Sequence, residues 1–335
     1  MKFGCNYEKF INNIDSFLNE SLQGFALAHH DIVEFNQEPR YIKRKTLKNT
    51  GKVVLISGGG SGHEPLHSGF VGTGMLDAAC PGQIFTSPTP DQMLMAAQAV
   101  QQDAGVLFIV KNYAGDVMNF EIASEMLEFE NASVLVSDDV SLPKSQSVGR
   151  RGVAGTLIVE KMVGAAAENG MALAECKALG DRINLSTASM GVALTSCTVP
   201  ALGKPTFLLG ENEMEIGVGI HGEHGRETVP LKSASEIVDQ IAGIIEEELH
   251  PSTGQSVLLH VNGFGGTPLT ELYLLYDLAA TYFQKRGLKI TRSLVGNFTT
   301  SLDMAGASIT LTLLDDELIR LWDAPVHTAA LRWGC

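Results

Sequence analysis

The stretch KVVLISGGGSGHEP, residues 52–65, indicates the fold class of this chain. It is an apolar run of strand length that leads directly into glycines, which is typical of a buried strand followed by a turn. GVLFIVKNYAGD at 105–116 repeats this plan, and ASVLVSDDV at 132–140 ends in two carboxylates. Helix-like segments at 91–103 and 119–129 separate the three runs. The pattern predicts a parallel or mixed sheet with helices on both faces, and in such sheets ligands collect where the strands open into loops.

The second half of the chain follows the same plan. A strand at 256–269 runs into glycines, an amphipathic helix follows it and ends at Gly287, and LKITRSLVG and ASITLTLLD predict two further strands. We therefore expect two α/β domains, 1–185 with glycine-rich substrate loops and 186–335 with a second sheet. Each sheet is expected to be flanked by helices, with a ligand site at the interface between the domains.

The remaining segments predict mostly helices. Residues 8–30 have apolar positions at mixed three- and four-residue spacing, which indicates an amphipathic helix, and a polar stretch, 31–51, follows it. From about residue 152 to 180 the chain reads as two helices rich in small residues, which suits close packing.

Composition excludes several classes of protein. A chain of 335 residues with 44% hydrophobic and 19% charged residues can bury a large core, which excludes disordered and fibrous proteins. The 24 Lys and Arg residues against 38 Asp and Glu give a net charge of -14, which argues against direct binding to nucleic acid or to an anionic membrane surface. No apolar run has the length of a membrane helix, and the start lacks the apolar core of a signal peptide. We expect a soluble, cytoplasmic protein.

The five cysteines give no sign of a disulfide framework or a zinc site. Cys5, Cys80, Cys176, Cys197 and Cys335 are scattered, without a Cys-x-x-Cys pair and without histidines at ligand spacing. We interpret them as reduced thiols that are mostly buried.

The glycine-rich segment 57–65 is a candidate binding loop. Its backbone N–H groups have no bulky side chains beside them, so a ligand oxygen can approach closely. It is neither a Walker A loop nor a convincing dinucleotide fingerprint. His63 strengthens the functional interpretation, although a solvated loop histidine is the alternative. Asp138 and Asp139 also end a predicted strand, and helix or turn capping is the stronger interpretation for them.

Lys111 and Asp116 stand where the second predicted strand ends. A cation that emerges directly from an apolar run is costly unless it faces a cleft or a partner. Asp116 follows a glycine and could accept a hydroxyl proton or orient a ligand.

In the second half, His221 lies between glycines after an alternating strand, without large neighbours in the sequence. Such a ring could meet a small molecule as a nucleophile or a metal ligand, but Glu223 and His224 do not supply a metal-ligand spacing, so no metal is expected. The other histidines are interpreted as surface or packing residues, namely His29, His30, His67, His250, His260 and His327. Motifs of serine hydrolases, zinc proteases and kinases are absent from the sequence. The residues alone thus predict one polar small-molecule cleft and leave its ligand unnamed.

Eight longer strings do suggest a ligand. They are SGGGSGHEP, FTSPTPDQ, VKNYAGDVMNFE, GRRGVAGT, CTVPALGKP, ENEMEIGVGIHGE, VNGFGGTPLTELY and TSLDMAGASITL. With them the chain resembles the dihydroxyacetone-binding K subunits of dihydroxyacetone kinases, from about residue 8 to 333.

The resemblance implies a covalent mechanism. In that family a histidine, matched here by His221, captures the ketone of dihydroxyacetone as a hemiaminal. The matching positions that hold the substrate's oxygens are Gly60, Ser61, Gly62, His63, Lys111 and Asp116. Asp116 would act as general base in phosphoryl transfer, and His63 would assist in proton transfer. The resemblance also implies that this chain binds no nucleotide. ADP or ATP with Mg would bind to a separate L subunit, recharged by an M subunit of the phosphotransferase system, and the chain would form a homodimer.

Two departures from the family leave a second function open. The loop 140–148 carries a proline and lacks the usual tyrosine, and His224 replaces a usual proline. Both lie where an L subunit would dock. Some kinase operons encode a K-like paralogue that binds dihydroxyacetone but acts as co-activator of a TetR-type transcription regulator. A catalytically inactive paralogue of this kind would keep His221, His63 and Asp116 and change its docking loops.

Overall fold

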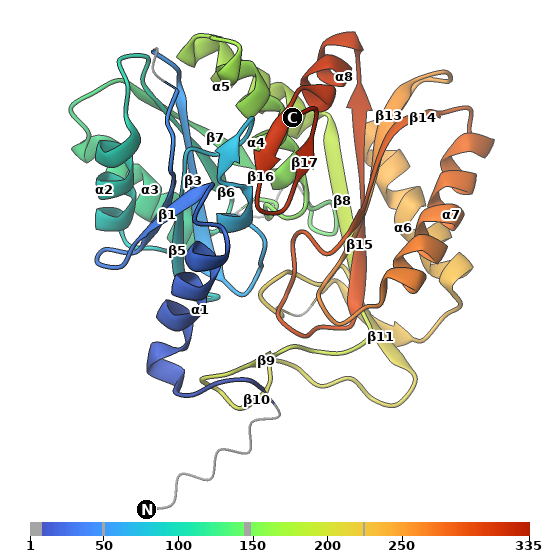
Figure 1. Ribbon diagram of the computed structural model, residues 1–335. Coiled ribbons are helices and arrows are strands. Elements are labelled where there is room, and N and C mark those ends of the chain that lie inside the picture. Colours follow the sequence, from blue (N-terminus) through green and yellow to red (C-terminus); the bar gives the residue numbers. More distant parts are fainter. Residues whose placement is uncertain (1–8, 49–50, 144–148, 224) are drawn as a thin grey trace, which may run out of the picture.

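The computed structural model describes residues 9–48, 51–143, 149–223 and 225–335. Layers of helices alternate with two large sheets (Figure 1). An outer pair, α2 (Pro90–Val100) and α3 (Ala114–Met126), covers the first sheet. A middle group separates the two sheets, and a second outer pair covers the far side of the second sheet. The middle helices are α4 (Gly155–Glu168), α5 (Leu173–Leu185) and α8 (Asp316–Asp323), and the second outer pair is α6 (Ala234–Leu249) and α7 (Leu269–Lys285).

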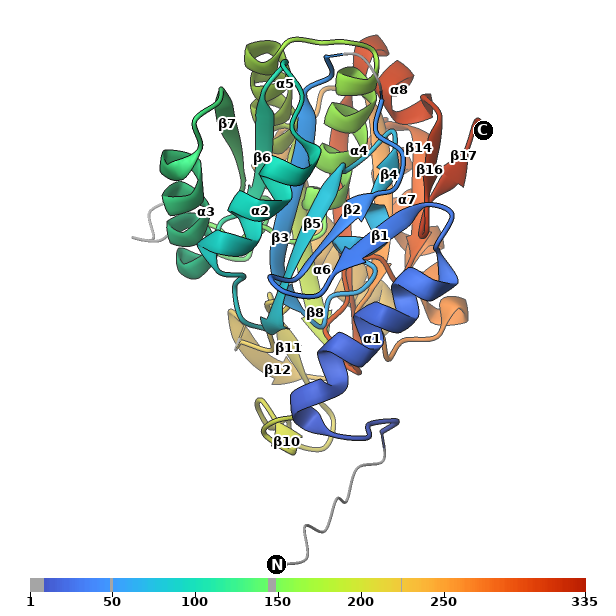
Figure 2. The same ribbon diagram turned by 60° about the vertical axis from the view of Figure 1, so that its left-hand side comes forward.

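The first sheet is mixed. Its strands, in spatial order, are β1 (Val33–Asn36), β2 (Tyr41–Arg44), β5 (Ala78–Ile84), β3 (Val54–Ser61), β6 (Val106–Lys111) and β7 (Asn131–Val136). The last four run parallel, whereas β1 and β2 form an antiparallel hairpin joined to β5. This confirms the expected mixed sheet. The hairpin lies within the polar stretch 31–51, beside α1 (Ile14–Ala28) (Figure 2).

Both faces of strands β3 and β6 are buried, as their continuous apolar runs predict. Leu55 and Leu107 belong to the core cluster shared with α4, while the alternate residues Ile56 and Phe108 belong to the cluster shared with α2 and α3. Because the site side chains follow these strands, their backbone positions are fixed by packing on two sides.

The second sheet is also mixed. Its strands, in spatial order, are β12 (Glu227–Pro230), β11 (Glu213–Ile216), β8 (Thr187–Ala193), β15 (Gly306–Leu314), β13 (Ser256–Gly263) and β14 (Lys289–Gly296). Only β13 and β14 pair in parallel. Helix α6 begins with a capping box, in which Ser233 accepts a hydrogen bond from the backbone N–H of Glu236 and the Glu236 carboxylate accepts in return.

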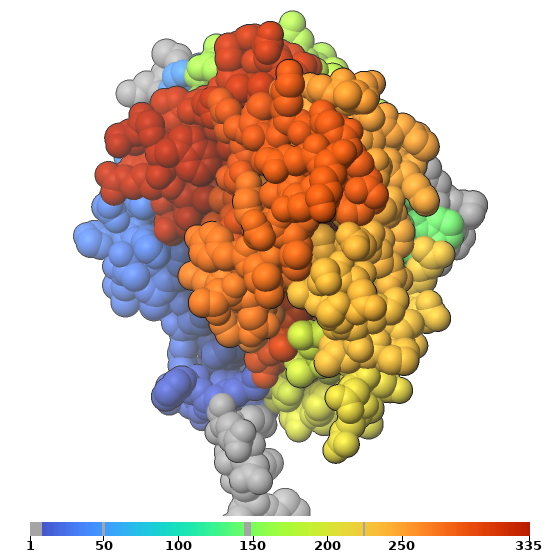
Figure 3. All heavy atoms as spheres, turned by 90° about the vertical axis from the view of Figure 1, so that its right-hand side faces the viewer, coloured from blue at the N-terminus to red at the C-terminus, as the bar shows by residue number. Residues whose placement is uncertain are grey.

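Short strands complete the fold. They are β4 (Gly72–Thr73), β9 (Thr198–Val199), β10 (Lys204–Pro205), β16 (Val326–Thr328) and β17 (Arg332–Trp333), with a 3-10 turn at Ser68–Phe70. Strand β16 pairs with β4, so the end of the chain lies against the first half of the molecule (Figure 3). The division at residue 185 stays a prediction. This division lies between α5 and β8. After β15, however, the chain returns to the first half of the molecule, where β16 pairs with β4.

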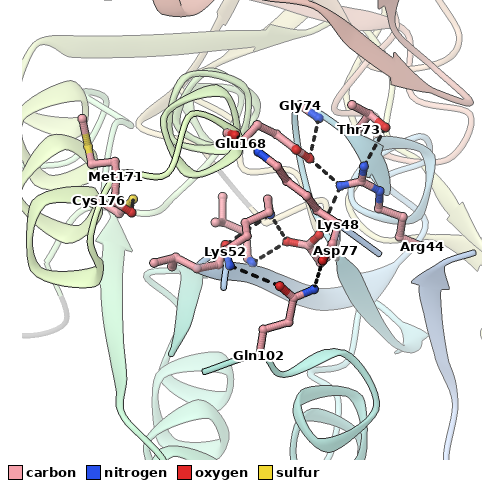
Figure 4. A network of polar contacts seen from close by, with 12 residues as sticks. Arg44, Lys48, Lys52, Thr73, Gly74, Asp77, Gln102, Glu168, Met171 and Cys176 are labelled. Atoms are coloured by element: carbon pink, nitrogen blue, oxygen red, sulfur yellow. Dashed lines mark hydrogen bonds and ion pairs between the residues drawn. The ribbon is translucent and has the colours of Figure 1, made fainter. Parts of the chain in front are cut away.

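A network of charged groups joins the start of β3 to the end of α4 (Figure 4). Asp77 accepts hydrogen bonds from Lys52 Nζ and from the backbone N–H of Leu55, the latter at 2.9 Å. Arg44 pairs with Glu168, whose carboxylate also accepts from the backbone N–H of Gly74 at 3.3 Å. Among the described residues, no buried side-chain polar atom of this network lacks a partner.

Across the described ranges, no helix combines the length and apolar character needed to cross a membrane. Cys80, Cys176 and Cys197 are buried free thiols, as expected, and Cys335 is exposed. Burial raises the pKa of the Cys176 thiol to about 11. Cys5 lies outside the described residues.

Candidate active site

Two histidines from the two halves of the chain meet at the candidate site. His63 follows β3, and His221 lies in the loop after β11. Their ring centroids are 4.7 Å apart, with the rings inclined at 73°. Residues predicted separately from two glycine-rich segments are therefore in direct contact.

His221 is held by a carboxylate. Its Nδ1 lies 3.0 Å from Glu223 Oε1, and its backbone N–H donates to Glu223 Oε2 at 3.0 Å. Gly219 makes room for this contact, because a Cβ there would lie 2.0 Å from Glu223 Oε2. Burial alone would raise the pKa of Glu223, but the hydrogen bond and charge of His221 together with Arg151 lower it to about 2. An ionised Glu223 keeps a proton on Nδ1, which leaves Nε2 with a lone pair for chemistry.

The expectation that His221 has no large neighbours is wrong. Besides His63, the ring is flanked by Tyr113 at 4.5 Å and Phe85 at 5.4 Å between centroids, both nearly perpendicular to it. The glycines next to His221 make room for the protein's own side chains. Sequence reasoning missed Phe85 and Tyr113, since three segments distant in the chain bring these rings together.

Tyr113 adds a polar group to this ring cluster. Its hydroxyl is buried and has no hydrogen-bond partner among the described residues, and burial raises its pKa well above the ordinary value. The phenol therefore keeps its proton and can donate to an oxygen placed beside His221.

His63 is fully buried, so its interpretation as a solvated loop histidine is wrong. It packs parallel to Phe85 at 5.1 Å, and its Nδ1 lies 2.7 Å from the carbonyl oxygen of Thr300. Burial, followed by the charges of His221 and Lys111, lowers the pKa of His63 well below its usual range. The ring is therefore neutral, Nδ1 donates to the carbonyl, and Nε2 remains a buried acceptor without a partner among the described residues.

Lys111 and Asp116 lie close together at the end of β6. Lys111 Nζ is 3.6 Å from Asp116 Oδ2 and donates to the carbonyl oxygen of Gly58 at 3.3 Å. The other carboxylate oxygen, Oδ1, is buried without a partner in the described part of the chain. Asp116 lies in the first turn of α3, because this helix begins at Ala114 and not near residue 119 as expected. Gly59 makes room for the ammonium group, since a Cβ there would lie 2.1 Å from Nζ.

The remaining predicted substrate-binding residues have protein partners. Gly60 and Ser61 belong to β3 itself and not to a loop. The Ser61 hydroxyl donates to the carbonyl oxygen of Gly82 at 2.7 Å, and the N–H of Gly62 donates to the Glu64 carboxylate. A Cβ at Gly60 would meet the backbone N of Thr86 at 2.6 Å. These residues therefore shape the end of β3, and the Ser61 hydroxyl and the Gly62 N–H are taken up by protein acceptors.

His67 is not an ordinary packing residue, in contrast to the sequence-based interpretation. It is buried between two charged side chains, with Nε2 at 3.0 Å from Lys111 Nζ and Nδ1 at 2.5 Å from Glu160 Oε1. The sequence could not indicate this, because Glu160 lies 93 residues further along the chain.

The carboxylates after β7 are capping residues, as the stronger interpretation held. Asp138 accepts from the backbone N–H groups of Val153 and Gly155 at the start of α4, at 2.8 and 2.7 Å. Asp139 accepts from the N–H of Ser141 and from Arg151. Of the changed loop 140–148, residues 144–148 lie outside the described residues, as does His224. The described ranges contain no cluster of His, Cys, Asp and Glu that could hold a metal ion.

Comparison with known proteins places this geometry in a family. The model of the Dak1 domain matches residues 23–330. This chain belongs to the Dak1 family. It is 47% identical to the protein described as "PEP-dependent dihydroxyacetone kinase, dihydroxyacetone-binding subunit DhaK" of Escherichia coli, over 98% of this chain and 99% of the relative. The corresponding subunit of PTS-dependent dihydroxyacetone kinase 1 of Listeria innocua is 44% identical, over 96% and 99% of the two chains.

Solved structures of the Dak1 fold agree. The dihydroxyacetone kinase operon co-activator DhaQ superposes with a TM-score of 0.88 at 31% identity, covering 93% of this chain and 97% of that one. The dihydroxyacetone kinase of C. freundii superposes with a TM-score of 0.86 at 34% identity, over 97% of this chain and 60% of the kinase. The α/β fold with two sheets flanked by helices is therefore that of the family.

Proposed function

We propose that this Dak1 chain is the dihydroxyacetone-binding subunit of a phosphotransferase-dependent dihydroxyacetone kinase. The relatives with 47% and 44% identity carry that description and are matched over almost their whole length. The observation that carries the proposal is the contact of His221 Nδ1 with the Glu223 carboxylate at 3.0 Å. With the Nδ1 proton donated to that carboxylate, Nε2 is the ring nitrogen left as a nucleophile. The side chain is 16% exposed, so a small molecule can reach it.

The capture step follows from these atoms. Nε2 of His221 adds to the carbonyl carbon, so that an N–C bond forms, the π bond of the ketone breaks, and its electron pair moves to oxygen. The ring becomes positive, and the adjacent Glu223 carboxylate stabilises that charge and accepts the Nδ1 proton. The oxygen takes up one proton from the neighbouring Tyr113 hydroxyl. Tyr113 recovers a proton from solvent, and Glu223 releases the Nδ1 proton to solvent, so no net proton is gained or lost. The product is a neutral hemiaminal, and glycerol, which has no carbonyl, cannot form it.

The transfer step uses the other end of the site. A terminal hydroxyl of the bound sugar loses its proton to Asp116 as its oxygen attacks the γ-phosphorus of a nucleotide on a separate L subunit. The P–O bond to the leaving nucleotide breaks, and the phosphoryl group moves to the sugar. His63, neutral with a bare Nε2, is a second acceptor for a proton in transit. ADP or ATP and Mg are assigned to the L subunit.

The co-activator function is the second candidate. The DhaQ chain has the same fold but only 31% identity to this chain, below the 47% of the kinase subunit, which favours the kinase assignment. A co-activator would bind a TetR-type regulator in place of the L subunit. We also propose the homodimer that the family resemblance implies, and a monomeric mass by light scattering at micromolar concentration would contradict it.

Reconstitution separates these functions. The chain would be mixed with L and M subunits, phosphoenolpyruvate and dihydroxyacetone, and phosphorylated product would be measured. The kinase assignment requires product that depends on this chain. Adduct formation without product, together with dihydroxyacetone-dependent binding to a TetR-type regulator, would establish the co-activator.

A further inference from the structure

Behind Lys111, away from His221, a line of buried polar groups continues into the middle helix layer. It runs from Asp116 through Lys111 and His67 to Glu160 on α4. All four residues are buried, with relative exposures of 2%, 0%, 6% and 0%. Each of these ionisable groups costs free energy to remove from water, and its buried contacts must offset that cost.

The donor and acceptor roles along this line are determined by its chemistry. An ammonium group has only donors, so Nε2 of His67 must accept from Lys111 Nζ. Burial, followed by the positive charge of Lys111, lowers the pKa of His67 well below its usual range, so the ring carries one proton. That proton is therefore on Nδ1 and is donated to Glu160 Oε1, 2.5 Å away. Burial raises the pKa of Glu160 to about 8, and Oε1 accepts whether or not the carboxyl is protonated.

Lys111 depends on this acceptor for its position. Besides His67 Nε2, the acceptors near Lys111 Nζ among the described residues are the carbonyl oxygen of Gly58 at 3.3 Å and Asp116 Oδ2 at 3.6 Å. Without Nε2 as an acceptor, the ammonium would turn fully onto Asp116, the carboxylate that the transfer step needs. Shifts of about 1 Å in a positioned group can change a rate by about 100-fold.

We propose that His67 and Glu160 are positioning residues of the site: Glu160 accepts the Nδ1 proton of His67 and so orients its ring toward Lys111, and His67 Nε2 then holds Lys111 away from Asp116. This inference rests on the proposed function only for its kinetic consequence. The tautomer and the contact with Lys111 are properties of the chain itself.

Paired variants separate positioning from packing. In His67→Gln the side-chain amide reaches the place of Nε2 and can still accept from Lys111, whereas in His67→Asn it reaches only the place of Nδ1, toward Glu160. In Glu160→Gln the amide oxygen can replace Oε1, whereas Glu160→Met has no acceptor. Lys161→Met is the matched control, because Lys161 is equally buried on the same helix but donates to the carbonyl oxygen of Leu321.

The first measurement is ¹⁵N NMR of the histidine-labelled full chain, with the His67 signals assigned by their loss in His67→Gln. We expect a neutral ring with the proton on Nδ1 in the unmodified chain and in Glu160→Gln and Lys161→Met, and loss of that single tautomer in Glu160→Met. A proton on Nε2 in the unmodified chain would overturn the inference, whatever the chain's activity.

The second measurement is turnover with L and M subunits, compared with adduct formation. His67→Asn and Glu160→Met should lower kcat by about 10- to 100-fold, with adduct formation changed much less, while His67→Gln and Glu160→Gln retain most of kcat. Equal losses in His67→Gln and His67→Asn, or an equal loss in Lys161→Met, would overturn the kinetic claim. If the unmodified chain forms neither adduct nor product, the proposed function fails and the NMR result still decides the tautomer.

Discussion

Two buried groups of charges lie at opposite ends of β3, and they differ in how completely they are paired. At the start of the strand, Lys52, Asp77 and the Arg44–Glu168 pair form a network in which no buried side-chain polar atom of the described residues lacks a partner. At its end, Asp116 Oδ1 and His63 Nε2 are buried without partners within the described ranges.

This difference distinguishes a structural network from a functional one. An unpaired buried acceptor costs about 1–3 kcal/mol, so we expect a bound water or a ligand to complete it. The paired network should therefore affect stability without affecting chemistry, and the unpaired groups should do the reverse. The predictions below test that division, from the largest expected effect to the smallest.

The largest effect is expected at the nucleophile. In His221→Ala no nitrogen can attack the ketone, so the covalent adduct should be lost completely. The measurement is ¹³C NMR with dihydroxyacetone labelled at its carbonyl carbon, which shows a protein-bound tetrahedral carbon only when the adduct forms. His30→Ala, which removes an exposed histidine in the turn after α1, should leave the adduct unchanged. An adduct that persists in His221→Ala would reject the covalent assignment.

Asp116→Asn should separate capture from transfer. The amide keeps the shape of the side chain but cannot accept the proton of the substrate hydroxyl, so product formation with L and M subunits should fall about 1,000-fold. The adduct on His221 should still form, because Glu223 and Nε2 are untouched. Full turnover in this variant would show that the unpaired oxygen of Asp116 is not the base.

The paired network gives the opposite pattern. Lys52→Met leaves Asp77 with the N–H of Leu55 and with Arg44 at 3.5 Å, so the free energy of unfolding should fall by about 3 kcal/mol. Urea unfolding measures this loss, and the double variant Lys52→Met with Asp77→Asn should recover part of it. Adduct formation by the folded chain should stay within about twofold of the unmodified protein. A large loss of adduct at unchanged stability would contradict the claim that the network at the start of β3 affects stability and not chemistry.

The fold could be predicted from the sequence where one short segment determines the structure. The runs at β3, β6 and β13 are apolar on both faces, which indicates buried strands directly. The hairpin of β1 and β2 was missed because its strands are only four residues long and half of their side chains are polar. The start of α3 was placed too late, since Ala114 and Gly115 give no helix signal of their own.

For the candidate site, the sequence could predict individual residues but not the contacts between them. Lys111 could be recognised because a cation next to an apolar run is costly, and the glycines around His63 and His221 indicated close approach. What approaches them could not be predicted. Lys111 lies against Gly59, Glu223 lies against Gly219, and His67 meets Glu160, and each contact depends on how separate segments pack.

Glu223→Gln is expected to have the smallest effect on adduct formation. Glu223 combines features of both groups, because its carboxylate is paired and yet contacts the nucleophile His221. The amide oxygen can still accept from Nδ1, but it cannot stabilise the positive ring that forms as Nε2 attacks. A hydrogen bond to a charged group is worth about 1.4 kcal/mol more than a neutral one, so adduct formation should slow about tenfold. Because the pKa of Glu223 is lowered to about 2, the carboxylate is ionised throughout pH 5–9, and the ratio of the two rates should be constant over that range. Stopped-flow mixing with labelled dihydroxyacetone at several pH values measures this ratio. A ratio that approached one only at pH 5 would mean that Glu223 becomes protonated there in the unmodified chain. A ratio near one at every pH would show that the charge on this carboxylate is not what activates His221.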